Sequence, residues 1–165
     1  MIQFTQIAVA ALLTSLAIFT LRAKRRSPVN RAFAAQSLTF AGWVLGVSGL
    51  QSAHTVSSSF GFAFAFASLI PTAFVFFSCC YPNAVSWSPP WYARVVFTIG
   101  AVFMILSLTS NLVLQSARIE STGLTRKTGA LYPAFAFYFI VTWGIGVWVF
   151  VKKWRSSRGI GRAHV

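Results

Sequence analysis

Hydrophobic segments without a charged residue alternate with short polar connectors along almost the whole chain. Each segment is about 20 residues long, which is the length that an α-helix needs to cross a hydrocarbon core about 30 Å thick. The pattern therefore predicts an all-α fold, a polytopic transmembrane helix bundle with five spans in one region, residues 1–154. We expect the spans at about residues 2–21, 32–53, 60–81, 95–114 and 130–151.

One hydrophobic stretch has a period that is more typical of a strand. In FGFAFAFA, residues 60–67, large and small side chains alternate. A transmembrane strand needs only about 10 residues before a turn, whereas this apolar run continues to Tyr81. A lone strand would also leave its backbone groups unbonded in lipid. We therefore predict a helix, in which Phe62 lies against Phe66 one turn later.

The charges give the expected orientation. Only 9% of the residues are charged, against about 25% in a soluble domain, and the net charge is +13 with Glu120 as the single acidic residue. Of the 14 Lys and Arg residues, 11 lie in the first connector, the third connector and the C-terminal tail. Because basic residues stay on the cytoplasmic side, we expect the N-terminus outside, the C-terminus in the cytoplasm, and a multi-pass protein of the plasma membrane.

The same placement argues against nucleic acid as a partner. A nucleic-acid surface interleaves basic and aromatic residues on one face, whereas here the basic residues sit at the ends of spans. The run LRAKRRSPVNRAF, residues 21–33, instead marks the cytoplasmic end of the first span. The expected partners are therefore the lipid bilayer and, at the basic loops, its anionic headgroups.

Groups for acid–base or metal chemistry are nearly absent. Such chemistry needs carboxylates, histidines or thiolates that converge at one place. Glu120 is interpreted as a solvated loop charge and His54 as an interfacial histidine. The adjacent Cys79 and Cys80 are interpreted as packing thiols. We expect no catalytic residue, no cofactor, no metal and no enzyme activity of the chain itself.

Small and polar residues inside the predicted spans are candidates for helix contacts or for a ligand cavity. Gly42 and Gly46 form a GxxxG pair, which lets helix backbones approach within one chain or between the two chains of a homodimer. Pro71 removes a backbone hydrogen bond in mid-span and is expected to kink its helix, as a static bend or as a hinge. The milder polar residues, among which Asn111 and Gln36 are the main candidates for interhelical bonds or a cavity, are Gln36, Gln51, Thr109, Asn111 and Thr142.

Three longer motifs occur in order along the chain. SPVNRAFAAQSLTFAGWVLGV joins the first two spans, ASLIPTAFVFFSCCYP covers the third, and TGALYPAFAFYFIV opens the fifth. Their characteristic residues are Pro28, Asn30, Arg31, Phe33, Trp43 and Gly46 in the first motif, Pro71, Phe74, Phe77, Tyr81 and Pro82 in the second, and Gly129, Leu131, Tyr132, Pro133, Phe135, Tyr138 and Phe139 in the third.

Together these motifs resemble the N-terminal seven-transmembrane region of bacterial and archaeal sensor histidine kinases, over about residues 2–154. The resemblance implies a sensory input domain that detects an unknown small ligand or a state of the membrane. Such a domain passes its signal to a cytoplasmic kinase, cyclase or related output domain. The chain departs from the family because helices six and seven and an output domain are missing. We therefore expect a truncated signal-transduction protein of the two-component type.

The last residues offer an explanation for this departure. Residues 155–165 are expected to form a basic tail, and IGRAHV, residues 160–165, can be encoded by a string that resembles a sequencing adapter followed by a stop codon. The hypothesis is an artefact of sequencing, and the alternative is a short native tail.

Two other functions stay open at this stage. One is a small transporter or channel subunit, with a pathway lined by Asn111, Gln36, Gln51 or Thr142. The other is a membrane scaffold protein.

Overall fold

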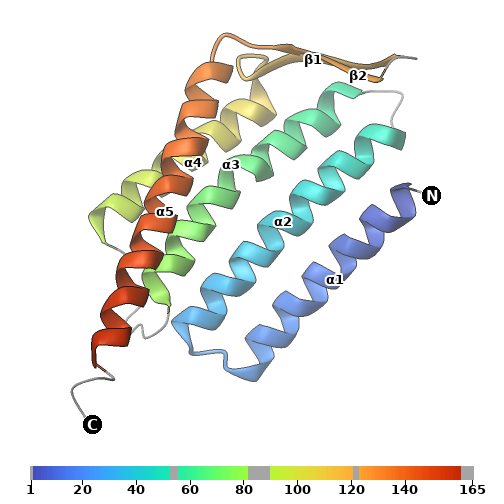
Figure 1. Cartoon of the computed structure of the whole chain (residues 1–165). Helices are drawn as coiled ribbons and strands as arrows, with labels where there is room; N and C mark the ends of the chain where they lie inside the picture. Colours follow the sequence, from blue (N-terminus) through green and yellow to red (C-terminus); the bar gives the residue numbers. More distant parts are fainter. Residues whose placement is uncertain (1, 53–55, 82–89, 121–122, 161–165) are drawn as a thin grey trace.

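The computed structural model describes residues 2–52, 56–81, 90–120 and 123–160. The described chain forms five helices and a two-stranded antiparallel hairpin, and the helices run alternately up and down (Figure 1). The elements are α1 (Ile2–Ala23), α2 (Pro28–Ser52), α3 (Val56–Cys80), α4 (Trp91–Thr109), β1 (Leu114–Glu120), β2 (Gly123–Thr128) and α5 (Tyr132–Ile160).

The helices confirm the expected membrane bundle. Among the described residues, α1, α3, α4 and α5 are long and apolar enough to cross a membrane. Their outward faces carry large apolar side chains, such as Phe4, which is 80% exposed, and Phe137, which is 71% exposed. Side chains of this kind are stable on a surface that meets lipid.

The second predicted span, residues 32–53, corresponds to α2, which is 25 residues long but contains more polar residues than the other helices. It lies between α1 and α3 (Figure 1), so part of its surface is covered by protein. Neighbouring helices can satisfy polar groups at that depth. Its crossing of the membrane, like the orientation of the bundle, stays a prediction.

Several boundaries differ from the expected spans. α3 begins at Val56, upstream of the expected start at residue 60, and α4 already ends at Thr109. α5 continues to Ile160, so residues 155–160 of the expected basic tail prolong the helix. Hydrophobicity marks where a helix meets lipid, whereas backbone hydrogen bonding sets where it ends, and the two positions need not coincide.

The connector after α4 is a hairpin, where the sequence led us to expect a loop. Arg118 pairs with Thr125, and Ala117 pairs with Arg126. The pairing continues past the hairpin toward α5, because the Leu131 amide donates to the Leu112 carbonyl at 2.8 Å. A short polar hairpin has no strong hydrophobic alternation, so the pattern of hydrophobic residues does not predict it.

α3 is the central helix and packs against α2, α4 and α5. The FGFAFAFA segment lies in α3, which confirms the prediction of a helix there. Its alternation gives α3 two kinds of contact: Ala63 and Ala65 are buried, and the rings of Phe62 and Phe66 lie 4.7 Å apart. The main apolar cluster joins α3, α4, α5 and the loop before β1, and consists of Val75, Ala93, Val96, Phe103, Val113, Phe135 and Tyr138.

Candidate functional site

Buried polar side chains lie close to Pro71 in the middle of α3. Pro71 is fully buried, and α3 stays helical through it. Because proline has no N–H, the carbonyl one turn earlier, that of Ala67, loses its usual helical donor. The neighbouring Ser68 carbonyl accepts a hydrogen bond from the Tyr138 hydroxyl of α5 at 2.9 Å. The proline-containing turn of α3 is thus bonded directly to α5.

Three buried hydroxyl groups link α3 to α4 and α5. The Thr72 Oγ1 and the Tyr138 hydroxyl lie 2.6 Å apart, within hydrogen-bonding distance. The Ser68 hydroxyl lies 2.7 Å from the Ala65 carbonyl and 3.2 Å from the Gly100 carbonyl of α4. We call Ser68, Thr72 and Tyr138 the hydroxyl cluster.

Gly100 makes room for the hydroxyl cluster. A Cβ at Gly100 would lie 2.6 Å from both Thr72 Oγ1 and the Tyr138 hydroxyl. The sequence alone does not predict the hydroxyl cluster; its signals are Ser68 and Thr72, which lie within three residues of Pro71, and Tyr138, which belongs to the third motif.

The glycine pair of α2 faces α3 within the same chain. A Cβ at Gly46 would lie 2.7 Å from the Cα of Ala63, and a Cβ at Gly42 would overlap the ring of Phe66. Both glycines are buried. The close approach that GxxxG permits is therefore used between α2 and α3.

Residues of the first sequence motif, SPVNRAFAAQSLTFAGWVLGV, stabilise the turn between α1 and α2. Pro28 is the first residue of α2, a position where proline is favoured. The Asn30 amide group donates to the Thr20 carbonyl near the end of α1 at 3.0 Å. Phe33 contacts Phe77 of α3 edge to face, with ring centroids 6.0 Å apart. These residues set how α1, α2 and α3 meet.

Two other motif residues lie at the surface of α2. Arg31 is exposed in the first turn of the helix. Trp43 is 39% exposed and lines a shallow pocket of about 220 Å³ between α1 and α2, next to Gln6.

Gln36 lies on α2 and is partly buried, and its Oε1 has no hydrogen-bond partner within the described part of the chain. Asn111 was expected inside the fourth span, but α4 ends at Thr109 and Asn111 lies exposed beyond it. Thr142 is buried on α5, and α3 lies between α2 and α5 (Figure 1). The described residues of the proposed polar pathway are therefore not brought together, and the side chain of Gln51 lies outside the described ones.

α5 is attached to α3 along most of its length. At its start, Tyr132 packs on Phe64 with ring centroids 6.3 Å apart, and Pro133 stands in the first turn. In the middle, the rings of Phe74 and Trp143 lie 4.5 Å apart, and Phe74 also covers Gly146.

Near the end of α3, the Lys153 ammonium group of α5 donates to the Cys79 carbonyl. This bond satisfies a carbonyl that has no partner within its own helix. Tyr81 and Phe150 stack at 5.3 Å beside it. The C-terminal half of α5 is thus coupled to the end of α3.

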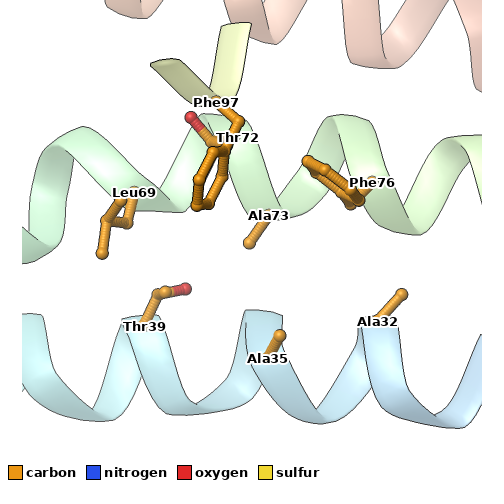
Figure 2. Close-up of a pocket in the computed structure, with 8 residues that line it drawn as sticks. All are labelled: Ala32, Ala35, Thr39, Leu69, Thr72, Ala73, Phe76 and Phe97. Atoms are coloured by element: carbon orange, nitrogen blue, oxygen red, sulfur yellow. The ribbon is translucent and has the colours of Figure 1, made fainter. Parts of the chain in front are cut away.

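A groove opens between α2 and α3, beside the hydroxyl cluster (Figure 2). Its volume is about 210 Å³. Thr39 and Thr72 are its polar residues, and the hydroxyl of Thr39 is already bonded to the Gln36 carbonyl at 2.8 Å. The residues that line the groove are Ala32, Ala35 and Thr39 of α2, Leu69, Thr72, Ala73 and Phe76 of α3, and Phe97 of α4.

Groups for acid–base or metal chemistry do not gather in the part of the chain that the structure describes. No group of three His, Cys, Asp or Glu side chains suited to a metal is found there. Cys79 is a free thiol whose sulfur lies 3.5 Å from the Tyr92 hydroxyl. The side chain of Glu120, His54 and the terminal residues 161–165 lie outside the described residues.

Comparison with known proteins yields one family. A family model described as the N-terminal 7TM region of histidine kinase matches residues 6–165. No curated protein and no solved structure matches the chain. The match covers the hairpin and all five helices, apart from the first residues of α1.

Proposed function

The chain belongs to the family of N-terminal seven-transmembrane regions of histidine kinases, and on this premise we propose that it is the sensory input domain of a signalling protein of the plasma membrane. It detects a small ligand or a change in the bilayer and is not itself catalytic. The five helices cross the membrane with the N-terminus outside, so that the end of α5 enters the cytoplasm.

The observation that supports this role is the attachment of α5 to α3. α3 is in contact with three other helices, so a ligand or lipid that shifts any of them acts on α3. α5 follows α3 through the hydroxyl cluster, the Phe74–Trp143 contact and the Lys153 bond. With 29 residues, α5 is about 43 Å long. It therefore exceeds a hydrocarbon core of about 30 Å, and its end is suited to carry the shift into a cytoplasmic domain.

The moving part in this proposal is α3 at Pro71. The missing backbone bond makes this turn easier to bend than a regular turn, and the bonds from Tyr138 and Thr72 hold it in one geometry. Close contact at Gly42 and Gly46 transfers a bend of α3 to α2. A stimulus would then shift the population between two packings of the bundle.

The test is a fusion of the whole chain, through α5, to the dimerisation and kinase domains of a histidine kinase. Tyr138→Phe removes the hydroxyl that joins α5 to α3. We expect it to change autophosphorylation by about two- to thirtyfold, which corresponds to the usual coupling energies along such networks. Phe137→Leu is the matched control, because Phe137 is on the same helix turn and 71% exposed. We expect it to leave autophosphorylation unchanged.

An autophosphorylation rate that does not respond to Tyr138→Phe, with equal amounts of fusion protein in the membrane, would contradict the proposal. Flux of ions or small solutes through liposomes that contain the chain would instead support the transporter alternative. Stable purification of the chain with an unrelated membrane complex would support the scaffold alternative.

A further inference from the structure

The groove between α2 and α3 is an apolar site that is open to the side of the bundle. Ala35 on its rim is exposed, and Phe97 is 52% exposed (Figure 2). The Thr72 hydroxyl is engaged with Tyr138, and the Thr39 hydroxyl with the Gln36 carbonyl. The groove thus offers no free hydroxyl to a polar ligand, and its occupant must be apolar where it touches the walls.

The size and shape of the groove suit a hydrocarbon chain. Its volume of about 210 Å³ exceeds the roughly 150 Å³ of a cavity that binds benzene. On α2 it extends from Ala32 to Thr39, and this separation of seven positions is about 10 Å along the helix. In a membrane protein, an open groove of this kind meets the acyl chains of the bilayer.

Positive charge lies at one end of the groove. Arg31 stands one turn before Ala35 on α2, and Arg94 stands one turn before Phe97 on α4, so each arginine lies on the face of its helix that carries a residue lining the groove. Both arginines are exposed. Both stand in the first turn of their helix, and the starts of α2 and α4 lie toward the end of the bundle that carries the basic α1–α2 loop (Figure 1). Arg22, Lys24, Arg25 and Arg26 lie in or next to that loop. The charge therefore favours an amphiphile with a negative head over a neutral one.

We propose that the α2–α3 groove binds one acyl chain of an anionic membrane phospholipid, whose headgroup lies near Arg31 and Arg94. The inference rests on the membrane setting of the proposed function and adds the class of ligand. The acyl chain contacts Thr72, the residue whose hydroxyl is bonded to Tyr138 of α5. Occupancy of the groove therefore acts on the same hydroxyl cluster that joins α3 to α5.

Photo-crosslinking of the chain in phosphatidylcholine vesicles tests the site directly. A trace of phosphatidylglycerol with a diazirine in its acyl chain is the probe, and phosphatidylcholine with the same acyl chain is the control probe. Mass spectrometry then locates the adducts. We expect adducts on Leu69, Phe76 or Phe97 with the anionic probe, several times more than with the neutral probe. Excess unlabelled phosphatidylglycerol should reduce these adducts more than excess phosphatidylcholine does.

Variants separate the acyl and headgroup contacts. Ala35→Phe blocks the rim of the groove and should reduce its adducts severalfold, whereas Ala11→Phe, at an exposed position of α1, should not. Arg31→Gln and Arg94→Gln should each weaken the preference for the anionic probe by about fivefold. Lys127→Gln is the matched charge control, at the hairpin on the other end of the bundle (Figure 1).

Two outcomes would overturn the inference: equal labelling by both probes, or adducts spread evenly to the lipid-facing Val102 and Ile105 of α4. The measurement needs no kinase domain. Adducts in the groove combined with a fusion protein that ignores Tyr138→Phe would therefore leave the lipid site standing and remove the sensory function. A lack of adducts in the groove combined with a fusion protein that responds to Tyr138→Phe would remove the lipid site and leave the sensory function standing.

Discussion

At the scale of single residues, the roles of the glycines follow from what lies opposite each of them. Gly46 faces the backbone of Ala63, while Gly144 has nothing within 4 Å of the position where a Cβ would stand. Both are helical glycines in predicted spans, so the sequence pattern does not distinguish one from the other. The difference is one of packing, because a backbone atom cannot move aside as the end of a flexible side chain can.

Gly46→Ala should therefore destabilise the chain. Its new Cβ would lie 2.7 Å from the Cα of Ala63, which forces α2 away from α3, and overpacking of this kind costs about 1–3 kcal/mol. Thermal unfolding of the purified chain in detergent measures the loss. Gly144→Ala is the control and should unfold at the wild-type temperature or slightly above it, because alanine is the better helix former. Equal melting temperatures for both variants would show that α2 and α3 leave room for a Cβ at position 46, which would contradict this prediction.

At the scale of elements, α3 combines a buried proline with hydrogen bonds from a neighbouring helix. Pro71 deprives Ala67 of its helical donor, and Tyr138 bonds the next carbonyl. Proline is tolerated in membrane helices when side chains of neighbours stabilise the affected turn. The geometry of α3 thus depends on α5, which is the property that a signalling helix pair needs.

Pro71→Ala should change the kinase output of the fusion protein at least about twofold. The alanine restores an N–H to the Ala67 carbonyl, so that α3 becomes stiffer at this turn. Autophosphorylation in isolated membranes is the measurement. Pro133→Ala is the matched control, because the first turn of α5 has no helical acceptor for that amide. A wild-type output from Pro71→Ala would remove the hinge from the mechanism and leave Pro71 as a static bend.

At the scale of the whole molecule, the number of helices that cross the membrane determines on which side of the membrane each loop lies. Lys24 lies before α2 and Lys127 lies after α4, and both are exposed. Three helices separate them, so the two residues lie on opposite sides of the membrane only when α2 crosses it. The less apolar α2 makes this the critical case.

Cysteine labelling resolves the crossings. In a Cys79→Ala and Cys80→Ala background, we expect Lys127→Cys to react with a membrane-impermeant maleimide in intact cells. Lys24→Cys should react only after the cells are opened. The positive-inside distribution is the physical reason, because the basic α1–α2 loop is retained in the cytoplasm. Reaction of both residues from the same side would reduce the bundle to four crossings.

The class of the molecule and the helical nature of its spans follow from the order of residues alone. Uncharged segments of bilayer length, with cations at their ends, leave helices as the stable solution, because lipid offers no partners to an open backbone. The sequence also located the family motifs and favoured a helix at the FGFAFAFA segment. These features are local, so they can be read along the chain.

Which residues meet follows from the packing of the helices and not from any one segment. In the folded chain the Gly42–Gly46 pair faces α3, and Asn111 lies outside α4. The hydroxyl cluster is formed by two helices that are far apart in the sequence. The hairpin and the helical extension of α5 to Ile160 came from backbone pairing that hydrophobicity does not report. Helix packing depends on which faces fit together in three dimensions, and no periodicity along one segment contains its partner.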